Sequence, residues 1–98
     1  MSVYKFRTII STNGGTGSEN TNNVIHGLCR QIYIKAGTSS TVFRATITDE
    51  DSDVVRSYGF SRGEIDDDKP LPVVGIYTIQ IASASVDGQF TCKMMVLE

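Results

Sequence analysis

Hydrophobic and polar residues alternate along most of this chain in short runs, without the spacing of an amphipathic helix. In the first run, Tyr4, Phe6 and Ile10 fall on one face of an extended chain, while Lys5 and Arg7 fall on the other. A period of two is typical of β-strands that bury one face. The pattern predicts strands over residues 3–12, 24–36, 41–48, 54–60, 73–86 and 89–97.

Turn and loop residues separate these runs. Residues 13–23 hold glycine, asparagine, threonine and serine but no apolar residue, which predicts a long, exposed and flexible loop. Within the second run, Gly27 predicts a bulge or bend. Residues 62–69 are polar and acidic, and Pro70 and Pro72 exclude a regular central strand there.

The dipeptide Asp87-Gly88 predicts a two-residue hairpin between the last two runs, since the central positions of such a turn favour these residues. With this tip, the facing apolar positions all lie on one side of the ribbon, so turn chemistry and alternation agree. The predicted pairs are Ile79 with Val96, Ile81 with Met94, Ser83 with Cys92, and Ser85 with Phe90.

The register between the third and fourth runs stays open. A two-residue turn at Asp51-Ser52 pairs Ile47 with Arg56, whereas a three-residue turn pairs Ile47 with Val55. The first places an apolar residue beside a charged one, and the second places two apolar residues together. The two-residue turn would also pair Phe43 with Phe60, and Ala45 with Tyr58.

Short strands in a chain of 98 residues predict an all-β fold with one domain over residues 1–98. We expect a single antiparallel β-sandwich, jelly-roll-like or Ig-like, with six to eight strands. Because the first and last runs alternate, we expect each sheet to bury one face and leave the other in water.

Composition and charge exclude several classes of protein. Nine Lys plus Arg against eleven Asp plus Glu give a net charge of −2, and the pI near 5.3 argues against a nucleic-acid partner. The apolar runs are too short for a membrane span. The first residues lack the pattern of a secretory signal, and we expect Cys29 and Cys92 to be buried thiols of a protein made in a reducing cytoplasm.

The sequence offers little for catalysis, and we assign no catalytic, cofactor-binding or metal-binding residue. The single histidine, His26, has no nucleophile or acid grouped with it and is expected at the surface or at a loop edge. One histidine and two distant cysteines do not make a zinc site. Residues 13–17 are glycine-rich but lack the Gly-Lys-Ser/Thr ending of a P-loop, so a flexible loop is expected.

Calcium is a further candidate ligand. Asp49, Asp51 and Asp53 alternate, although Val54 and Phe60 stand where an EF-hand loop needs glycine and glutamate. An irregular calcium site shared with a second acidic segment is the alternative to a solvated acidic turn that guards a sheet edge. That second segment contains Glu64, Asp66, Asp67 and Asp68.

Sugar binding on a β-sandwich would need exposed aromatic side chains. The chain has no tryptophan, and most of its four tyrosines and four phenylalanines are needed for the core. Tyr33 and Tyr58 are the candidates for exposure, since their neighbours leave their faces ambiguous.

Charge is segregated along the chain. Residues 1–44 hold five basic groups and one acid, whereas residues 45–98 hold four basic groups and ten acids. Most of the bases fall in predicted strands, and the acids cluster in two loops. Such a surface favours docking onto a neighbour, either an identical subunit or a larger scaffold. The bases of the first part are Lys5, Arg7, Arg30, Lys35 and Arg44.

Residues 71–79, Leu-Pro-Val-Val-Gly-Ile-Tyr-Thr-Ile, together with Asp87-Gly88-Gln89-Phe90, carry a resemblance. From Ile32 to its end, the chain resembles small β-sandwich proteins of bacteriophage particles, among them capsid decoration or cement proteins and tail-associated modules. The resemblance implies a compact β domain that assembles on a virion, commonly as a trimer or in many copies. It carries over no functional residue, because the shared positions make the fold.

We therefore expect a non-enzymatic structural virion protein of a bacteriophage, a capsid decoration or tail-associated subunit that acts through protein–protein docking. Its expected partners are further copies of itself, as in a trimer, and other virion proteins. We expect no nucleic acid, membrane, small-molecule substrate or cofactor. The protein would be made in the host cytoplasm and located in the virion. The alternative is a glycan- or calcium-dependent β-sandwich binding module.

Overall fold

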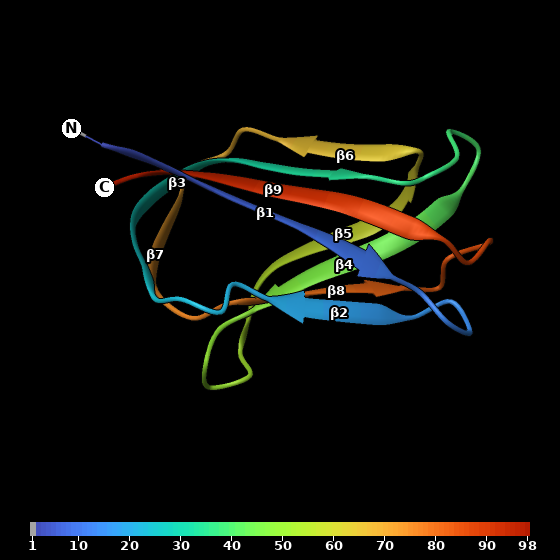
Figure 1. Ribbon diagram of the computed structural model, residues 1–98, viewed down its shortest axis with the longest axis horizontal. Helices are drawn as coiled ribbons and strands as arrows, with labels where there is room; N and C mark the ends of the chain where they lie inside the picture. The colour runs from blue at the N-terminus through green and yellow to red at the C-terminus, as the bar shows by residue number, and fades with distance from the viewer. Residues whose placement is uncertain (1) are drawn as a thin grey trace.

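The structure, a computed structural model, describes residues 2–98 as two antiparallel β-sheets packed face to face (Figure 1). Residues 2–98 contain no helix. Each predicted run is found as a strand, except that the run at 73–86 is interrupted. The strands are β1 (Val3–Ser11), β2 (Gly17–Asn20), β3 (Ile25–Lys35), β4 (Val42–Thr48), β5 (Val54–Arg62), β6 (Glu64–Asp67), β7 (Leu71–Gly75), β8 (Thr78–Ala82) and β9 (Gln89–Leu97).

The strand order is that of a jelly roll. One sheet has the order β1-β9-β3-β6, with β7 continuing along the same edge of β3, and the other has the order β2-β8-β4-β5. If β6 and β7 are counted as one interrupted strand, each sheet has four strands, and the chain changes sheet at most connections, as in two wound Greek keys. The predicted antiparallel sandwich is confirmed, in its jelly-roll form. Nine strands are found instead of six to eight, because β2 and β6 were not predicted and the run at 73–86 is divided between β7 and β8.

The core lies between the sheets and is made by the inward face of each strand. On β9, every second side chain from Phe90 to Val96 is buried, and β1 buries Phe6 and Ile10 in the same way. Phe43 of β4 meets Phe90 edge to face across the sandwich, with ring centroids 4.9 Å apart. Alternation therefore identified the buried faces correctly, and it leaves the outer faces in water.

The predicted hairpin at Asp87-Gly88 is wrong. β8 pairs with β2 and β4, whereas β9 pairs with β1 and β3, so the two strands lie in opposite sheets. Their apolar side chains meet across the core instead of side by side, and alternation looks the same in both arrangements. Residues 83–88 cross between the sheets, and the Ala84 amide donates to the Gly15 carbonyl at 3.0 Å on the way.

The segment predicted as a loop, residues 13–23, contains the strand β2. Asn13 and Thr16 form a bridge that turns the chain, and β2 then pairs with β8 at the edge of its sheet. Thr21, just after β2, is buried, and its hydroxyl accepts a hydrogen bond from the Tyr77 amide at 3.1 Å. Polar residues form this strand because, as an edge strand, it has most of its side chains in water.

The second half of the chain also departs from its predicted course. Residues 62–69 include the edge strand β6, and Pro72 lies in β7, which pairs only with β3, so the proline is found at a sheet edge as expected. The bulge predicted at Gly27 lies at Arg30, where the register of β3 against β9 shifts. Between β4 and β5, Ile47 faces Arg56, which is the two-residue-turn register.

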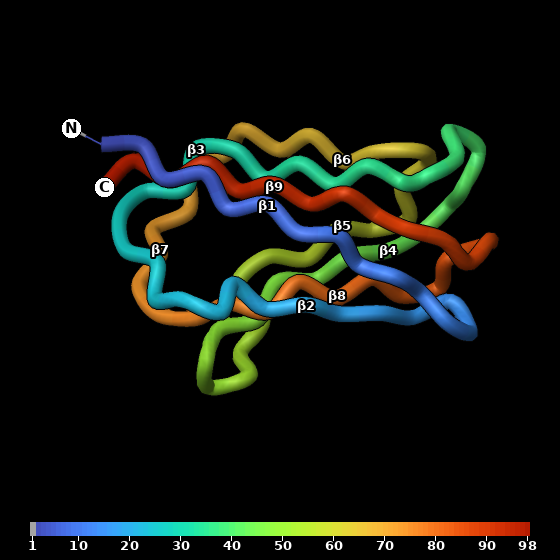
Figure 2. Tube along the Cα trace, in the orientation of Figure 1, coloured from blue at the N-terminus to red at the C-terminus, as the bar shows by residue number. Residues whose placement is uncertain are grey.

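That register does not continue to the end of the hairpin. A bulge follows Phe43, which therefore faces Ser61 instead of Phe60. The two ends of the described chain lie together, because β1 and β9 are paired along their whole length (Figure 2). The Glu98 amide donates to the Ser2 carbonyl at 3.0 Å beyond the last strand pair.

Candidate functional site

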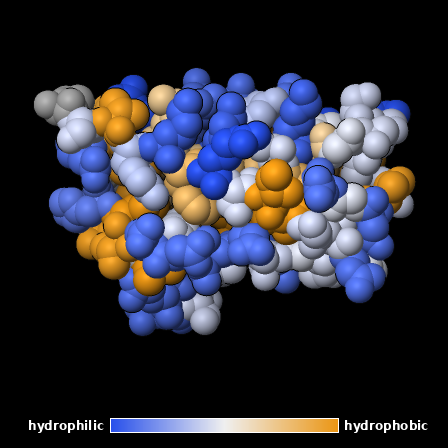
Figure 3. Space-filling view, viewed as in Figure 1, coloured by the Kyte–Doolittle hydropathy of each residue, from blue (hydrophilic) through white to orange (hydrophobic). Residues whose placement is uncertain are grey.

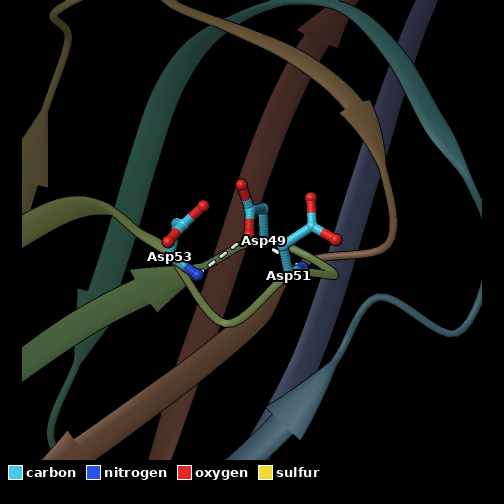
Figure 4. A group of neighbouring side chains, drawn as sticks. All are labelled: Asp49, Asp51 and Asp53. Atoms are coloured by element: carbon cyan, nitrogen blue, oxygen red, sulfur yellow. Dashed lines mark hydrogen bonds between the residues drawn. The ribbon is translucent and has the colours of Figure 1, made fainter.

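The acidic turn, Asp49, Glu50, Asp51 and Asp53, connects β4 to β5 and projects from one end of the sandwich (Figure 1). Carboxylate oxygens of its three aspartates lie within 4.8 Å of one another, the one group of this kind among residues 2–98. Figure 4 shows them side by side along the turn. Asp49 Oδ1 accepts the amides of Asp51 at 2.9 Å and Asp53 at 3.0 Å, so one oxygen already stabilises the turn.

The second acidic segment does not join this group, and the shared calcium site is not assembled. Three of its four carboxylates, those of Glu64, Asp66 and Asp67, accept hydrogen bonds from neighbouring side chains instead. Glu64 accepts the Tyr33 hydroxyl at 2.7 Å, and Asp66 accepts the Gln31 amide nitrogen at 3.1 Å. A cation at the acidic turn would therefore be held by residues 49–53 without help from residues 64–68.

A shallow hollow of about 510 Å³ lies beside the acidic turn, and we call it the valine hollow. Its walls combine carboxylates with two exposed aliphatic side chains, Val24 and Val74. Glu50 fixes one wall, because its Oε1 accepts the Ile76 amide at 2.6 Å and ties the acidic turn to the β7–β8 connection. The lining residues are Val24, Asp49, Glu50, Asp51, Val74, Gly75 and Tyr77.

Arg56, Tyr58 and Asp67 form a clasp between β5 of one sheet and β6 of the other. Asp67 Oδ2 accepts Arg56 Nη1 and the Tyr58 hydroxyl, each at 2.6 Å, and Asp67 Oδ1 accepts the Lys69 amide at 2.9 Å. Burial acts to raise the pKa of Asp67, but these three donors outweigh it and lower the pKa. Burial first, and then the bond to Asp67, raises the pKa of Tyr58. The clasp is a structural ion pair whose groups are mutually satisfied.

The outer face of the five-stranded sheet carries Lys5, Arg7, Lys35 and Lys93 among its basic side chains, and we call these four the basic band. Arg7 and Lys93 are direct cross-strand partners, and like charges at such positions repel. Among residues 2–98, the one ion pair within 4.0 Å is Arg56 with Asp67, so no carboxylate of the described chain forms such a pair with the band, and the one acidic cross-strand partner of a band residue is Glu64, opposite Lys35.

Tyr33 lies at the boundary between the basic band and the acids of β6. The Lys93 ammonium is 4.9 Å from the centre of the Tyr33 ring, while the Tyr33 hydroxyl donates to Glu64. The hydrogen bond to Glu64 raises the pKa of Tyr33. The face therefore runs from positive at the β1 edge to negative at the β6 edge, and the charge segregation predicted from sequence is present in space.

The histidine and the two cysteines considered from sequence are not brought together into a site. His26 is exposed on β3 opposite Val74. Cys29 and Cys92 are both buried and free, and burial raises the pKa of both thiols. Cys29 faces Val96, four residues along β9 from Cys92, so the two are roughly 13 Å apart at 3.3 Å per residue. They do not meet.

Backbone amides of the glycine-rich segment 13–17 bind an anionic group of the same chain, the carboxylate of Asp87. The amides of Gly14 and Gly15 donate to the two carboxylate oxygens of Asp87 at 3.0 and 2.8 Å. The bond from Gly15 is the main cause that lowers the pKa of Asp87. Sequence reasoning missed this contact because it joins segments more than 70 residues apart, and it explains the position of Asp87 better than a hairpin does.

Neither candidate aromatic is a free platform for a sugar. Tyr33 and Tyr58 are both half-buried, and each donates its hydroxyl to a carboxylate. The exposed aromatic is Phe60, on the outer face of β5, and the Arg44 guanidinium lies 5.2 Å from the centre of its ring.

The described residues include no helix long and apolar enough to cross a membrane.

No protein-family model matches the chain, and no curated protein matches its sequence. The VP2 subviral particle of infectious bursal disease virus aligns with 97% of this chain and 32% of its own, with 12% identity and a TM-score of 0.51. The Gx strain of the same virus aligns over 97% and 33%, with 11% identity and a TM-score of 0.44. A carbohydrate-binding module, CBM36 in complex with calcium and xylotriose, aligns over 96% and 87%, with 15% identity and a TM-score of 0.39.

The chain spans about a third of the length of the VP2 chains that it matches. At this identity the VP2 likeness shows a shared β-sandwich fold. Function has to be argued from the surface of this chain itself.

Proposed function

We propose that the protein is a non-enzymatic structural protein of a virus particle that acts by docking onto other virion proteins. In its finer form, the proposal places it on a bacteriophage as a capsid decoration or tail-associated subunit that is made in the host cytoplasm. Its partners would be further copies of itself and other virion proteins. The β-sandwich fold shared with VP2 supports the proposal at the level of fold, since jelly rolls recur in capsid shells.

The basic band is the observation that carries the proposal. Its four cations project from a rigid sheet, and two of them, Arg7 and Lys93, are held next to each other at a cost in stability. An acidic surface that covers the band would relieve that repulsion and would be attracted over about one Debye length, roughly 8–10 Å. Complementary charge of this kind directs which partner binds and how fast.

The test is the presence of the protein in purified particles and its dependence on the basic band. Particles from the source culture are purified on a density gradient, and the polypeptide is quantified by mass spectrometry. We expect the wild-type chain at a constant copy number and the Lys35→Glu/Lys93→Glu variant at a copy number at least severalfold lower. Arg44→Glu makes the same change of charge per substituted residue on the outer face of β4, in the other sheet, and should leave the copy number unchanged. Particles without the polypeptide, or normal incorporation of the double variant, would overturn the proposal.

A calcium-dependent binding module, with a glycan as the bound partner, is the second candidate. It is favoured by the grouping of Asp49, Asp51 and Asp53 beside the valine hollow. Isothermal titration with CaCl2, followed by a glycan array in calcium and in EDTA, tests it. Saturable calcium binding that Asp51→Asn abolishes would support the module, and a flat titration would exclude it.

A further inference from the structure

The outer face of β1 presents apolar and basic side chains in a fixed order. Val3, Lys5, Arg7 and Ile9 point to the same side, because they are alternate residues of one strand. Val3 is 55% and Ile9 46% exposed, so two aliphatic groups flank two cations over roughly 20 Å. Figure 3 shows this as blue atoms over the middle of β1 with orange patches toward its two ends.

The valine hollow presents the complementary chemistry. Val74 is 70% and Val24 65% exposed, which makes them the two most exposed large aliphatic side chains among the described residues. Asp49 and Asp51 line the same hollow, so apolar groups and carboxylates surround one concave surface. In Figure 3 an orange patch lies beside the blue acidic turn that projects from the lower edge.

The two surfaces belong to different parts of the molecule and cannot meet within one chain. β1 lies at one edge of the five-stranded sheet, whereas the acidic turn hangs from the end of β4 and β5 in the other sheet (Figure 1). A contact between them therefore joins two copies. Because the patches differ, the contact is heterologous and would repeat head to tail, closing into a ring or extending as a chain.

We propose that the outer face of β1 in one copy docks into the valine hollow of a second copy. Lys5 and Arg7 would pair with the carboxylates of Asp49 and Asp51, and the valines of the hollow would cover an exposed aliphatic group of β1. The contact removes apolar surface from water and neutralises Arg7, which Lys93 otherwise repels. The inference rests on the proposed function, for which it names the self-contact, and it leaves Lys35 and Lys93 for the scaffold.

A charge swap tests the contact in the purified full chain. Sedimentation velocity over a concentration series, in EDTA at low and at high salt, measures self-association. We expect association that weakens with salt, a rise of at least tenfold in the dissociation constant for Arg7→Glu or Asp51→Lys alone, and recovery in the Arg7→Glu/Asp51→Lys double variant. Arg44→Glu is the matched control and should associate like the wild type, and circular dichroism confirms that each variant is folded.

Two results would overturn the inference: a wild-type chain that stays monomeric at low salt, or a double variant that associates no better than the single ones. These results are separate from those of the particle experiment. A monomeric chain that is still found in purified particles refutes the self-contact and leaves the proposed function standing. A self-associating chain that is absent from particles refutes the proposed function and not the contact.

Discussion

Asp67 joins the two sheets at the edge away from β1 and β2, and replacing it should cost far more stability than an ordinary surface substitution. Asp67→Ala removes the acceptor for Arg56, Tyr58 and the Lys69 amide at once. A hydrogen bond to a charged group contributes about 1.5–3 kcal/mol, and breaking a buried ion pair costs about 3–5 kcal/mol. The side chains of Arg56 and Asp67 are 19% and 10% exposed, so water compensates only part of the loss.

We therefore expect Asp67→Ala to lower the free energy of unfolding by about 2–4 kcal/mol. Asp67→Asn keeps one carbonyl acceptor and loses the charge, so it should lower it by about 1–2 kcal/mol. Both are large fractions of the roughly 5–15 kcal/mol of a typical domain. Urea unfolding at pH 7, followed by far-UV circular dichroism, would show the midpoint for Asp67→Ala falling by about 1–2 M, given a slope near 2 kcal/mol/M.

The pH dependence gives an independent test. The pKa of Asp67 is lowered in the folded protein, so its contribution is fully present above the unfolded-state value of about 3.9 and is lost as the pH falls through the folded value. The midpoints of the wild type and Asp67→Asn should differ at pH 7 and converge as the pH falls below about 3.9.

Asp68→Ala, an exposed neighbour, is the matched control and should change the midpoint little. The clasp would be refuted as a stabilising element if Asp67→Ala behaved like Asp68→Ala at pH 7. A gap between the wild type and Asp67→Asn that stays constant into the acid range would contradict the electrostatic part of the reasoning.

Three further predictions test other parts of the fold. Asp87→Asn should accelerate hydrogen exchange at the amides of the β1–β2 turn, measured by NMR, with little change in global stability. Gly27→Ala should destabilise the protein by more than about 2 kcal/mol in urea, because φ is +140° and the new Cβ would collide with a backbone carbonyl of the chain end; Gly59→Ala meets nothing within 4 Å and should be neutral or slightly stabilising. Cys29 and Cys92 should resist a thiol reagent at pH 8 until urea unfolds the chain, since both are buried and burial raises the pKa of Cys92 to about 12; labelling of the folded protein would contradict this.

Local alternation was enough to find most strands and their buried faces, because it records which side chains must leave water. It identified Phe6 and Ile10 of β1 as inward-facing, and it separated them from Lys5 and Arg7 on the outside. It failed for β2, whose residues are mostly exposed and whose pairing with β8 is made by backbone groups. A strand without an apolar face leaves no period-two signal in the sequence.

The sequence predicted the charged regions of the candidate site but not which charges pair with one another. The charge count predicted a basic and an acidic region, and the register of β1, β9 and β3 turned the first of these into one band. The count could not show that Asp67 pairs with Arg56 while the basic band forms no ion pair within 4.0 Å. That division depends on β5 and β6 meeting at one edge, which is a property of topology, not of composition.

The failed hairpin shows why the topology itself was out of reach. Asp87-Gly88 and the alternation on both sides satisfied every local condition for a turn, and the apolar side chains of β8 and β9 are buried in the same core. The two strands lie on opposite sides of that core, at the spacing of two packed sheets, about 10 Å, instead of the 4.7–4.9 Å between paired strands. Local patterns record which face is buried and not which sheet buries it. The contacts of Asp87 distinguish the crossing between sheets from a hairpin. Its carboxylate accepts hydrogen bonds from the amides of Gly14 and Gly15, and these bonds hold residues 83–88 on their path from one sheet to the other.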